Sequence, residues 1–519
     1  MLEGTFVVDK FREAFEKHKE KPIALYGFGK YTRLIIQQCS DFNIVAVCGN
    51  TNDVSDELFE NKPIVAIEEI HRLSDKIVII ARRSFLKEIY ERIQCVTEKN
   101  NITVYSIYKE NLKEYFKQAS TELTGNLAHT DKKQTIERIV ESLKKYAAHE
   151  ADYKLIDMYK RTVLEQATIE SGKIQITKPE DVGRFFIGPL VLGFLNHAFR
   201  KLDGLGNETI LWFLARDGYF IQKMYEKFKN KSGYACLPEG KYVLSSRRNL
   251  SVVSLQNEED IKEIIQYSKG IRGDVHSYLK NKLGIYIRQD VDLEMTDEEK
   301  VQYVLSYEKE ILERATWERQ NYFRYLEKEK LFRPQIVLFD LVTSGTSYRY
   351  ARKMFEEHEI KLLCFQYLNS ECDLEGSKEY LWLGEQGFYS REYYFTQLFP
   401  ICEIIFGPDS TMFMCMDENG VPCYAEDADE KYRKQWHDNI KPIQQAAEAW
   451  LDEIYAMMPD CFAKEYSNQL IDRMYALISI YYTEVAECVK QGFELENAFE
   501  NAGYYNVWKS NVDTFYETI

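Results

Sequence analysis

The segment from residue 335 to 355 combines residue types that suit phosphate binding. Four apolar residues, 336–339, predict a buried strand that ends at Asp340. Apolar residues recur at helical spacing from Tyr348 onward. Between them lies a turn of small residues: Thr343, Ser344, Gly345, Thr346 and Ser347. A strand, a tight turn and a helix start direct backbone N–H groups and the positive end of a helix dipole at one point, which favours a phosphate group.

Individual residues of this turn support that interpretation. Gly345 allows the backbone to approach a ligand closely, and the hydroxyl groups of Thr343, Thr346 and Ser347 add donors. The turn lacks the lysine and the length of a Walker A loop, which argues against an ATPase site. The alternative is an ordinary strand-to-helix turn in which a threonine or serine caps the helix.

The segment resembles the ribosyl-phosphate loop of the phosphoribosyltransferases. That loop follows a strand with two acidic residues, two apolar residues and the pattern T-x-G-x-T/S. Asp340 matches the second acidic position, and residues 343–347 match the loop. The resemblance implies that Asp340 contacts ribose hydroxyl groups and that the loop holds a 5-phosphate. Phe339 stands where the first acid should be, a departure from conventional ribose recognition.

Two upstream segments place charged residues at similar points. The pattern of residues 210–228 predicts an apolar strand, then a turn containing Arg216, Asp217 and Gly218, and then a helix. The pattern of residues 241–250 predicts a strand that ends in two serines, Arg247 and Arg248. Open α/β sheets bind ligands where strands end and helices begin. The resemblance assigns the first turn and the two adjacent arginines to pyrophosphate. The alternatives are a surface ion pair between Arg216 and Asp217, and a solvated or carboxylate-paired Arg247–Arg248.

The motifs LARDGYF, SSRR and D-x-x-x-x-G-T together are similar to a domain found in bacterial O-antigen and capsule loci, often joined to a phosphatase of the haloacid-dehalogenase type. The resemblance spans roughly residues 181–424. It implies an inverting transferase that moves a 5-phosphoribofuranosyl unit from phosphoribosyl pyrophosphate to the hydroxyl group of a glycan or lipid-linked glycan, giving a β product. A separate phosphatase would then remove the phosphate.

This chemistry needs a base and a neutralised leaving group. Asp217 is the first candidate for the base and Glu403 the second, because a carboxylate can take the proton of the acceptor hydroxyl. Glu403 lies in the apolar stretch FPICEIIFGP, so a structural role is an equal alternative. Mg²⁺ bound with the donor pyrophosphate, together with arginine, would neutralise the charge that leaves.

Bulk properties exclude several other classes. A net charge of −16 argues against general nucleic-acid binding. The eleven cysteines show no CxxC pair and no metal-ligand spacing, so we expect no zinc-type metal site and a reducing, cytoplasmic setting. No signal peptide and no run of about 18 apolar residues is recognised, so we expect at most peripheral membrane association.

We predict an α/β protein with four regions. Residues 1–110 form a Rossmann-like domain in which Gly27 and Gly29 match two glycines of GxGxxG, while Asn50 and Asp53 stand where a ribose ligand is expected. Residues 111–200 form a helical packing region. Residues 201–426 form a phosphoribosyltransferase-like parallel-sheet core with a helical insertion at 257–332, and residues 427–519 form a C-terminal helical region.

Two other functions remain open from the sequence. The missing acid at Phe339 and Thr32 in the third place of the glycine pattern favour a protein that senses a phosphate or nucleotide without chemistry. The N-terminal domain favours a glycosyltransferase that uses a nucleotide-diphosphate sugar.

Overall fold

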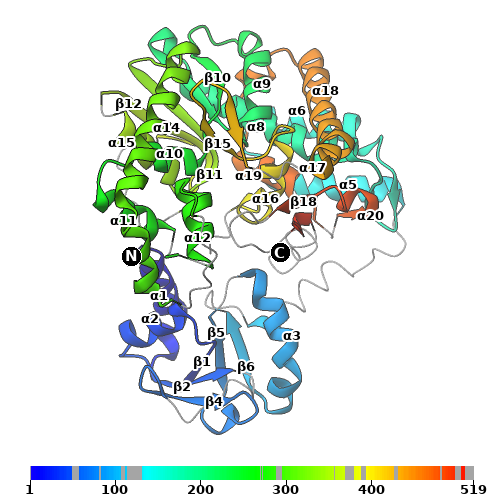
Figure 1. Cartoon of the computed structure of the whole chain (residues 1–519). Coiled ribbons are helices and arrows are strands. Elements are labelled where there is room, and N and C mark those ends of the chain that lie inside the picture. The colour runs from blue at the N-terminus through cyan, green and yellow to red at the C-terminus, as the bar shows by residue number, and fades with distance from the viewer. Residues whose placement is uncertain are drawn as a thin grey trace.

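The computed structural model has the α/β architecture predicted from the sequence, with two parallel sheets flanked by helices (Figure 1). The described residues are 2–49, 58–80, 83–106, 111–113, 131–268, 270–271, 273–287, 295–355, 357–368, 379–386, 393–425, 430–479, 482–496 and 504–508.

The first sheet lies in the N-terminal part, at the bottom of Figure 1. Its order is β3-β4-β2-β1-β5-β6, and every described pairing is parallel except that of β3 with β4. The central β1 is followed by β2 on one side and by β5 on the other, which is a doubly wound arrangement. The strands are β1 Ile23–Tyr26, β2 Ile44–Gly49, β3 Leu58–Phe59, β4 Lys62–Ala66, β5 Lys76–Ile79 and β6 Thr103–Ser106. The helices are α1 Leu2–Phe15, α2 Lys30–Gln38 and α3 Arg83–Lys99.

The second sheet is entirely parallel and has the order β10-β9-β11-β12-β13, with β14 also paired to β12. The strands are β9 Thr209–Leu214, β10 Glu239–Val243, β11 Gln335–Thr343, β12 Glu359–Leu368, β13 Tyr380–Leu381 and β14 Glu385–Gln386. All residues of β9 are buried, because helices cover both faces of a parallel sheet and its central strands are therefore apolar throughout.

One face of the second sheet is covered by helices that precede the sheet in the chain and by helices that follow it. They share a single hydrophobic cluster with the sheet residues Phe213, Phe339 and Phe365. We call this cluster the first core. The regions 111–200 and 427–519 therefore pack together on the sheet. The helices are α5 Lys132–Lys144, α6 Glu150–Tyr159, α7 Pro179–Val182, α8 Gly188–Leu202, α9 Gly218–Phe228, α16 Phe395–Ile405, α17 Glu430–Gln435, α18 Lys441–Met457, α19 Asn468–Ala476 and α20 Glu487–Lys490. Short strands accompany them: β7 Ile169–Glu170, β8 Lys173–Ile176, β17 Thr483–Val485, β18 Glu494–Glu496 and β19 Tyr504–Asn506.

One helical stretch of the described chain, Pro179–Leu202, is long and apolar enough to cross a membrane by length and composition, which the sequence inspection missed. The protein buries 94% of its most apolar window. The stretch is thus the central helix of the first core, which fits a soluble protein.

The opposite face of the second sheet is covered by the insertion at 257–332, which is helical as expected. Trp212 and Leu338 of the sheet share a hydrophobic cluster with Ile264 and Tyr322 of the insertion. We call this cluster the second core. In Figure 1 these green helices lie on the side of the sheet away from α18. The helices on this face are α10 Arg247–Val253, α11 Glu258–Tyr267, α12 Val275–Tyr278, α13 Asp297–Leu305, α14 Glu308–Lys328 and α15 Thr346–Met354.

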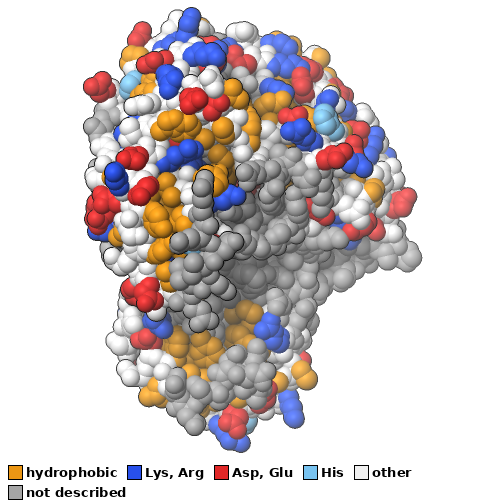
Figure 2. Space-filling view, viewed as in Figure 1, with side chains coloured by type: hydrophobic (Ala, Val, Ile, Leu, Met, Phe, Trp, Pro, Cys, Tyr) orange, Lys and Arg blue, Asp and Glu red, His pale blue; other side chains and the backbone are white. Residues whose placement is uncertain are grey.

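A hairpin of β15 Phe413–Met416 and β16 Pro422–Tyr424 lies against α14. The turn between them is held by Asp417, whose Oδ1 accepts from the N–H groups of Asn419 at 2.9 Å and Val421 at 2.7 Å, and Gly420 has φ +76°. Figure 2 shows charged side chains of both signs interspersed on this face of the molecule rather than gathered into a basic surface.

The start of α16 is fixed by a carboxylate from α19. Asp472 accepts from the backbone N–H groups of Tyr394 and Phe395, each at 2.8 Å, and is 1% exposed. These N–H groups belong to the first turn, where a helix supplies no acceptor of its own. Asp472 therefore fixes the helix that carries Glu403.

Replacing Asp472 by alanine should loosen the start of α16, because two N–H groups lose their acceptor. We expect a local cost of about 2 kcal/mol, which corresponds to roughly thirtyfold faster amide exchange of residues 394–397. Asp472→Asn keeps one oxygen acceptor and should change the exchange less. Hydrogen exchange followed by mass spectrometry measures both variants; unchanged exchange in the alanine variant would show that the cap is dispensable.

Candidate functional site

The three turns identified in the sequence lie at one edge of the second sheet. They follow β9, β10 and β11, which are parallel and adjacent in the order β10-β9-β11. The N–H group of Ala215 in the first turn donates to the carbonyl oxygen of Val243 at the end of β10, at 3.1 Å. The first core holds α9 and the second holds α10 and α15, so the chain leaves β9 and β11 toward opposite faces. Ligands bind at such switch points in open α/β sheets.

Three carboxyl groups, Asp217, Asp340 and Glu403, come together at this edge; we call them the carboxylate cluster. Burial, and next the charges of Glu403 and Asp340, raise the pKa of Asp217 well above its ordinary value. Burial raises the pKa of Glu403 to about 7, partly opposed by Arg247 and increased further by Asp340. Burial also raises the pKa of Asp340, against the effects of Arg247 and of the hydroxyl groups of Thr343 and Ser347. Each carboxyl residue keeps part of its surface exposed, so a ligand can reach it.

Two arginines lie near the cluster without forming an ion pair with its carboxyl groups. Arg216 donates to the hydroxyl group of Tyr432 at 3.2 Å and lies 5.3 Å from the centre of its ring, while that hydroxyl donates to the carbonyl oxygen of Pro408 at 2.9 Å. Arg247 is the exposed first residue of α10. Neither guanidinium has an ion-pair partner within 4.0 Å among the described residues. Both can therefore take an anionic ligand.

The loop after β11 has the geometry of an anion site. Gly345 has φ +86° and precedes α15, a conformation that favours glycine. Its N–H group donates to Thr343 Oγ1 at 2.9 Å, and the hydroxyl oxygens of Ser344 and Thr346 lie 3.1 Å apart. The first N–H groups of a helix have no intrahelical acceptor, so those of α15 remain available to a phosphate.

Gly218 is required where β9 passes into α9. A Cβ atom at this position would lie 2.6 Å from the carbonyl carbon of Phe213 and 2.7 Å from the Phe213 Cβ atom. The helix therefore begins in direct contact with the strand, and its N-terminus stays beside Arg216 and Asp217. The peptide bond between Ala215 and Arg216 is cis.

Arg248 does not join the carboxylate cluster. Its guanidinium binds both carboxylate oxygens of Glu318 at 2.5 and 2.9 Å and the carbonyl oxygen of Met414 at 2.9 Å, and its side chain is 2% exposed. Arg314 Nε also donates to Glu318, at 2.7 Å. Because Arg248 is buried in its ion pair with Glu318, it is not available to a ligand at the cluster. Arg248 instead anchors α10 to α14.

Phe339 is an interior residue. Its ring lies 5.3 Å from the rings of Phe194 and Phe213, in the first core. Because successive side chains of a strand point to opposite faces, Asp340 projects to the other face. The position of the missing acid is therefore occupied by a packing residue.

Two further neighbours of the cluster escaped the sequence analysis. Tyr432 belongs to the C-terminal region, and Lys282 to the insertion. Burial, and next the charge of Arg247, lower the pKa of Lys282 to about 8. Neither residue lies in a recognisable motif, and only their packing brings them to Arg216 and Arg247.

The N-terminal glycines occupy the corresponding place in the first sheet. Gly27 follows β1 with φ +107°, and Gly29 precedes α2. Asn50 and Asp53 lie outside the described residues. Within the described chain, no three histidine, cysteine or carboxylate side chains are grouped so as to hold a metal ion by themselves.

The chain was also compared with known proteins. No protein-family model matches it, and the search of curated proteins finds no match.

Replacing Glu318 by glutamine should destabilise the second core, because Arg248 would stay buried without a counter-charge. Breaking one partner of a buried pair costs about 3–5 kcal/mol. Urea unfolding followed by tryptophan fluorescence gives the free energy of unfolding. Glu313→Gln, one turn earlier on the exposed face of α14, is the matched control and should change it by less than about 1 kcal/mol. Equal stability of the two variants would contradict the anchoring role of Arg248.

Proposed function

We propose that this protein transfers a 5-phosphoribofuranosyl group from phosphoribosyl pyrophosphate to a glycan hydroxyl group. The supporting observation is the meeting, at one switch point, of an anion-type loop, two arginines outside ion pairs and three carboxyl groups. A donor with a phosphate at one end and a pyrophosphate at the other needs cations at two places and polar acceptors for the ribose between them.

The donor would lie across the three strand ends. Its 5-phosphate would accept from the loop at residues 343–347 and from the start of α15. Asp340 would accept from the ribose hydroxyl groups. The pyrophosphate would be bound by Arg216, Arg247 and the N–H group of Gly218. Lys282 is an electrostatic neighbour of Arg247 and would be a further cation. Positive groups placed where charge develops stabilise the departing pyrophosphate.

The carboxyl groups of Asp217 and Asp340 are of the type that Mg²⁺ takes, together with substrate phosphates and water rather than a cage of protein ligands. When bound, the ion would supply neutralisation of the pyrophosphate charge. Both residues keep part of their surface exposed.

The acceptor hydroxyl must lose a proton as it attacks the anomeric carbon from the face opposite the pyrophosphate, which gives the inverted β product. Glu403 is the better base in this structure, because its pKa is raised to about 7 while that of Asp217 is raised well above its ordinary value. Neighbouring carboxyl groups with different pKa values can take different roles in one site.

A soluble transferase of this kind would work in the cytoplasm on a glycan or lipid-linked glycan, at most touching the membrane surface, and would leave the phosphate for a separate phosphatase. The N-terminal sheet remains a candidate nucleotide-binding or partner-binding unit. A site that binds the donor without turnover would instead be a phosphate sensor.

Asp340→Asn and Arg247→Ala should each lower pyrophosphate release from phosphoribosyl pyrophosphate, measured with Mg²⁺ and a synthetic oligosaccharide, by about 10²–10³-fold. Mass spectrometry of the oligosaccharide should show an added pentose phosphate with the unchanged protein and with the control below, and far less with the two site variants. Arg352→Ala, an exposed arginine on the same helix as the loop, is the control and should retain full activity. Donor binding without product, in the unchanged protein, would support the sensor instead. If deletion of residues 1–110 abolishes the product but leaves donor hydrolysis intact, we would assign sugar binding to the first sheet instead.

The rate should depend on pH through Glu403. The carboxyl group must be ionised to take a proton, so kcat/KM for the donor should rise as the pH increases through about 7. Glu403→Gln should remove this limb and lower the rate by about 10²–10⁴-fold. A pH profile of pyrophosphate release for both proteins provides the measurement, and an identical limb in the glutamine variant would assign the base to another group.

A further inference from the structure

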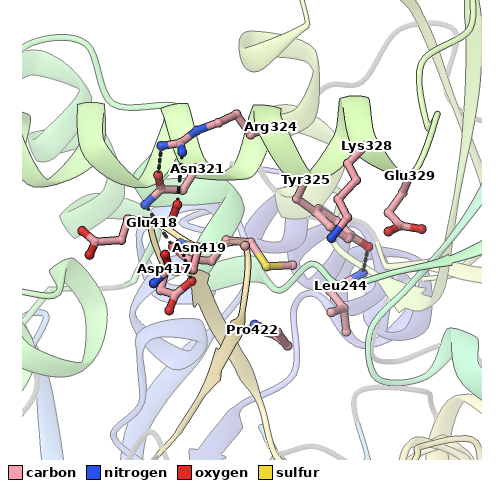
Figure 3. A pocket seen from close by; sticks show the side chains of 12 residues that line it. Leu244, Asn321, Arg324, Tyr325, Lys328, Glu329, Asp417, Glu418, Asn419 and Pro422 are labelled. Carbon is pink, nitrogen blue, oxygen red and sulfur yellow. Dashed lines mark hydrogen bonds between the residues drawn. The ribbon is translucent and has the colours of Figure 1, made fainter.

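A pocket of about 380 Å³ lies between the C-terminal half of α14 and the β15–β16 hairpin (Figure 3). Leu244, the residue that follows β10, closes its third side. The volume falls within the range of about 300–1,000 Å³ that is usual for small-ligand sites. Nothing in the chemistry assigned so far uses this pocket.

The walls of the pocket are amphipathic. The ring of Tyr325 and the side chains of Met416 and Pro422 supply apolar surface, and Figure 3 shows Tyr325 and Lys328 beside Leu244 on one side. The carboxyl groups of Glu329 and Glu418 also line it. In the part of the chain that the structure describes, Lys328, Glu329 and Glu418 have no ion-pair partner within 4.0 Å. These groups can therefore bind hydroxyl groups of a ligand.

Two other charged residues of the pocket are structural. Arg324 donates to the carbonyl oxygen of Glu418 at 3.1 Å and to the side-chain oxygen of Asn321, and Asp417 holds the hairpin turn. Of the groups not occupied in this way, one is basic and two are acidic. This balance disfavours a phosphate and suits an uncharged, polyhydroxylated ligand. A flat aromatic ring with hydrogen-bonding groups around it matches a sugar, whose C–H face is apolar and whose edge carries hydroxyl groups.

The pocket is joined to the proposed donor site by two hydrogen bonds. The N–H group of Leu244 donates to the hydroxyl oxygen of Tyr325 at 3.1 Å, and the preceding residue, Val243, accepts from Ala215 at 3.1 Å. Ala215 is followed directly by Arg216 and Asp217. The pocket wall and the turn at the leaving group are therefore held in a fixed relation.

Tyr242 lies near residues of both sites. Tyr242 of β10 makes an edge contact with Tyr219 at the start of α9, with ring centres 5.5 Å apart. The pKa of Tyr242 is raised by burial, and its electrostatic neighbours are Tyr424 and Tyr325 on the pocket side and Arg216 and Asp217 on the cluster side. Tyr242 is thus near residues of both the pocket and the carboxylate cluster.

We propose that this pocket binds the acceptor glycan, with an uncharged sugar unit against Tyr325 and the reacting hydroxyl group directed past Tyr242 toward the carboxylate cluster. This inference rests on the proposed transferase function, and it names the acceptor side of that same site.

Tyr325→Ala and Lys328→Ala test the inference on two kinds of contact, one aromatic and one polar, and Lys328 is exposed, so its replacement leaves the core intact. The probes are the methyl glycosides of glucose, galactose, mannose, rhamnose and N-acetylglucosamine, observed by saturation-transfer NMR on the full chain. Binding of phosphoribosyl pyrophosphate is measured in parallel by calorimetry. Gln320→Ala, an exposed residue earlier on α14, is the matched control.

We expect saturation transfer to at least one glycoside in the unchanged protein and in the control, and a reduction of about tenfold or more in both pocket variants, with donor affinity unchanged. Absence of saturation transfer to all five glycosides in protein that binds the donor overturns the inference, as does equal transfer in the pocket variants. Failure of the unchanged protein to bind the donor would instead count against the transferase function, whatever the sugars do.

Discussion

The pairing of β9 with β10 on one side and with β11 on the other is the constraint on which the site depends. Because the three strands are parallel, their carboxyl ends share one edge, and the turns that follow them meet there. The hydrogen bond from Ala215 to Val243 fixes the first two turns relative to each other. The helices after β9 and β11 pack in different cores, which opens the space between these strands to a ligand.

The charged groups around this space then determine which ligands it can bind. Burial raises the pKa values of all three carboxyl groups, and neighbouring carboxylates raise those of Asp217 and Glu403 further. Arg216 and Arg247 oppose these shifts without an ion pair to a carboxylate within 4.0 Å among the described residues. Perturbed carboxyl groups in this setting are typical of functional sites, although structural networks also produce them. The difference between the two cases is visible at Arg248, whose charge is fully paired with Glu318 and removed from solvent.

The neighbouring residues Arg247 and Arg248 have different roles, one in the proposed ligand binding and one in structural support. Arg248 holds α10 against α14, and this position leaves Arg247 at the helix start facing the cluster. The same α14 carries Tyr325, which contacts the end of β10 through Leu244. The insertion at 257–332 therefore does more than cover a sheet face, because one helix supports both the arginine of the donor side and the wall of the neighbouring pocket.

The sequence by itself determined the α/β class, the strands and turns around Asp217 and Asp340, and the helical nature of the insertion, because these depend on local periodicity and on residues a few positions apart. It could not determine that Arg248 pairs with Glu318, that Tyr432 contacts Arg216, or that Pro179–Leu202 is a core helix. Those outcomes depend on which distant elements pack together. An amino-acid pattern specifies which face of an element is buried, whereas its partner is chosen by the summed packing and charge of the whole fold.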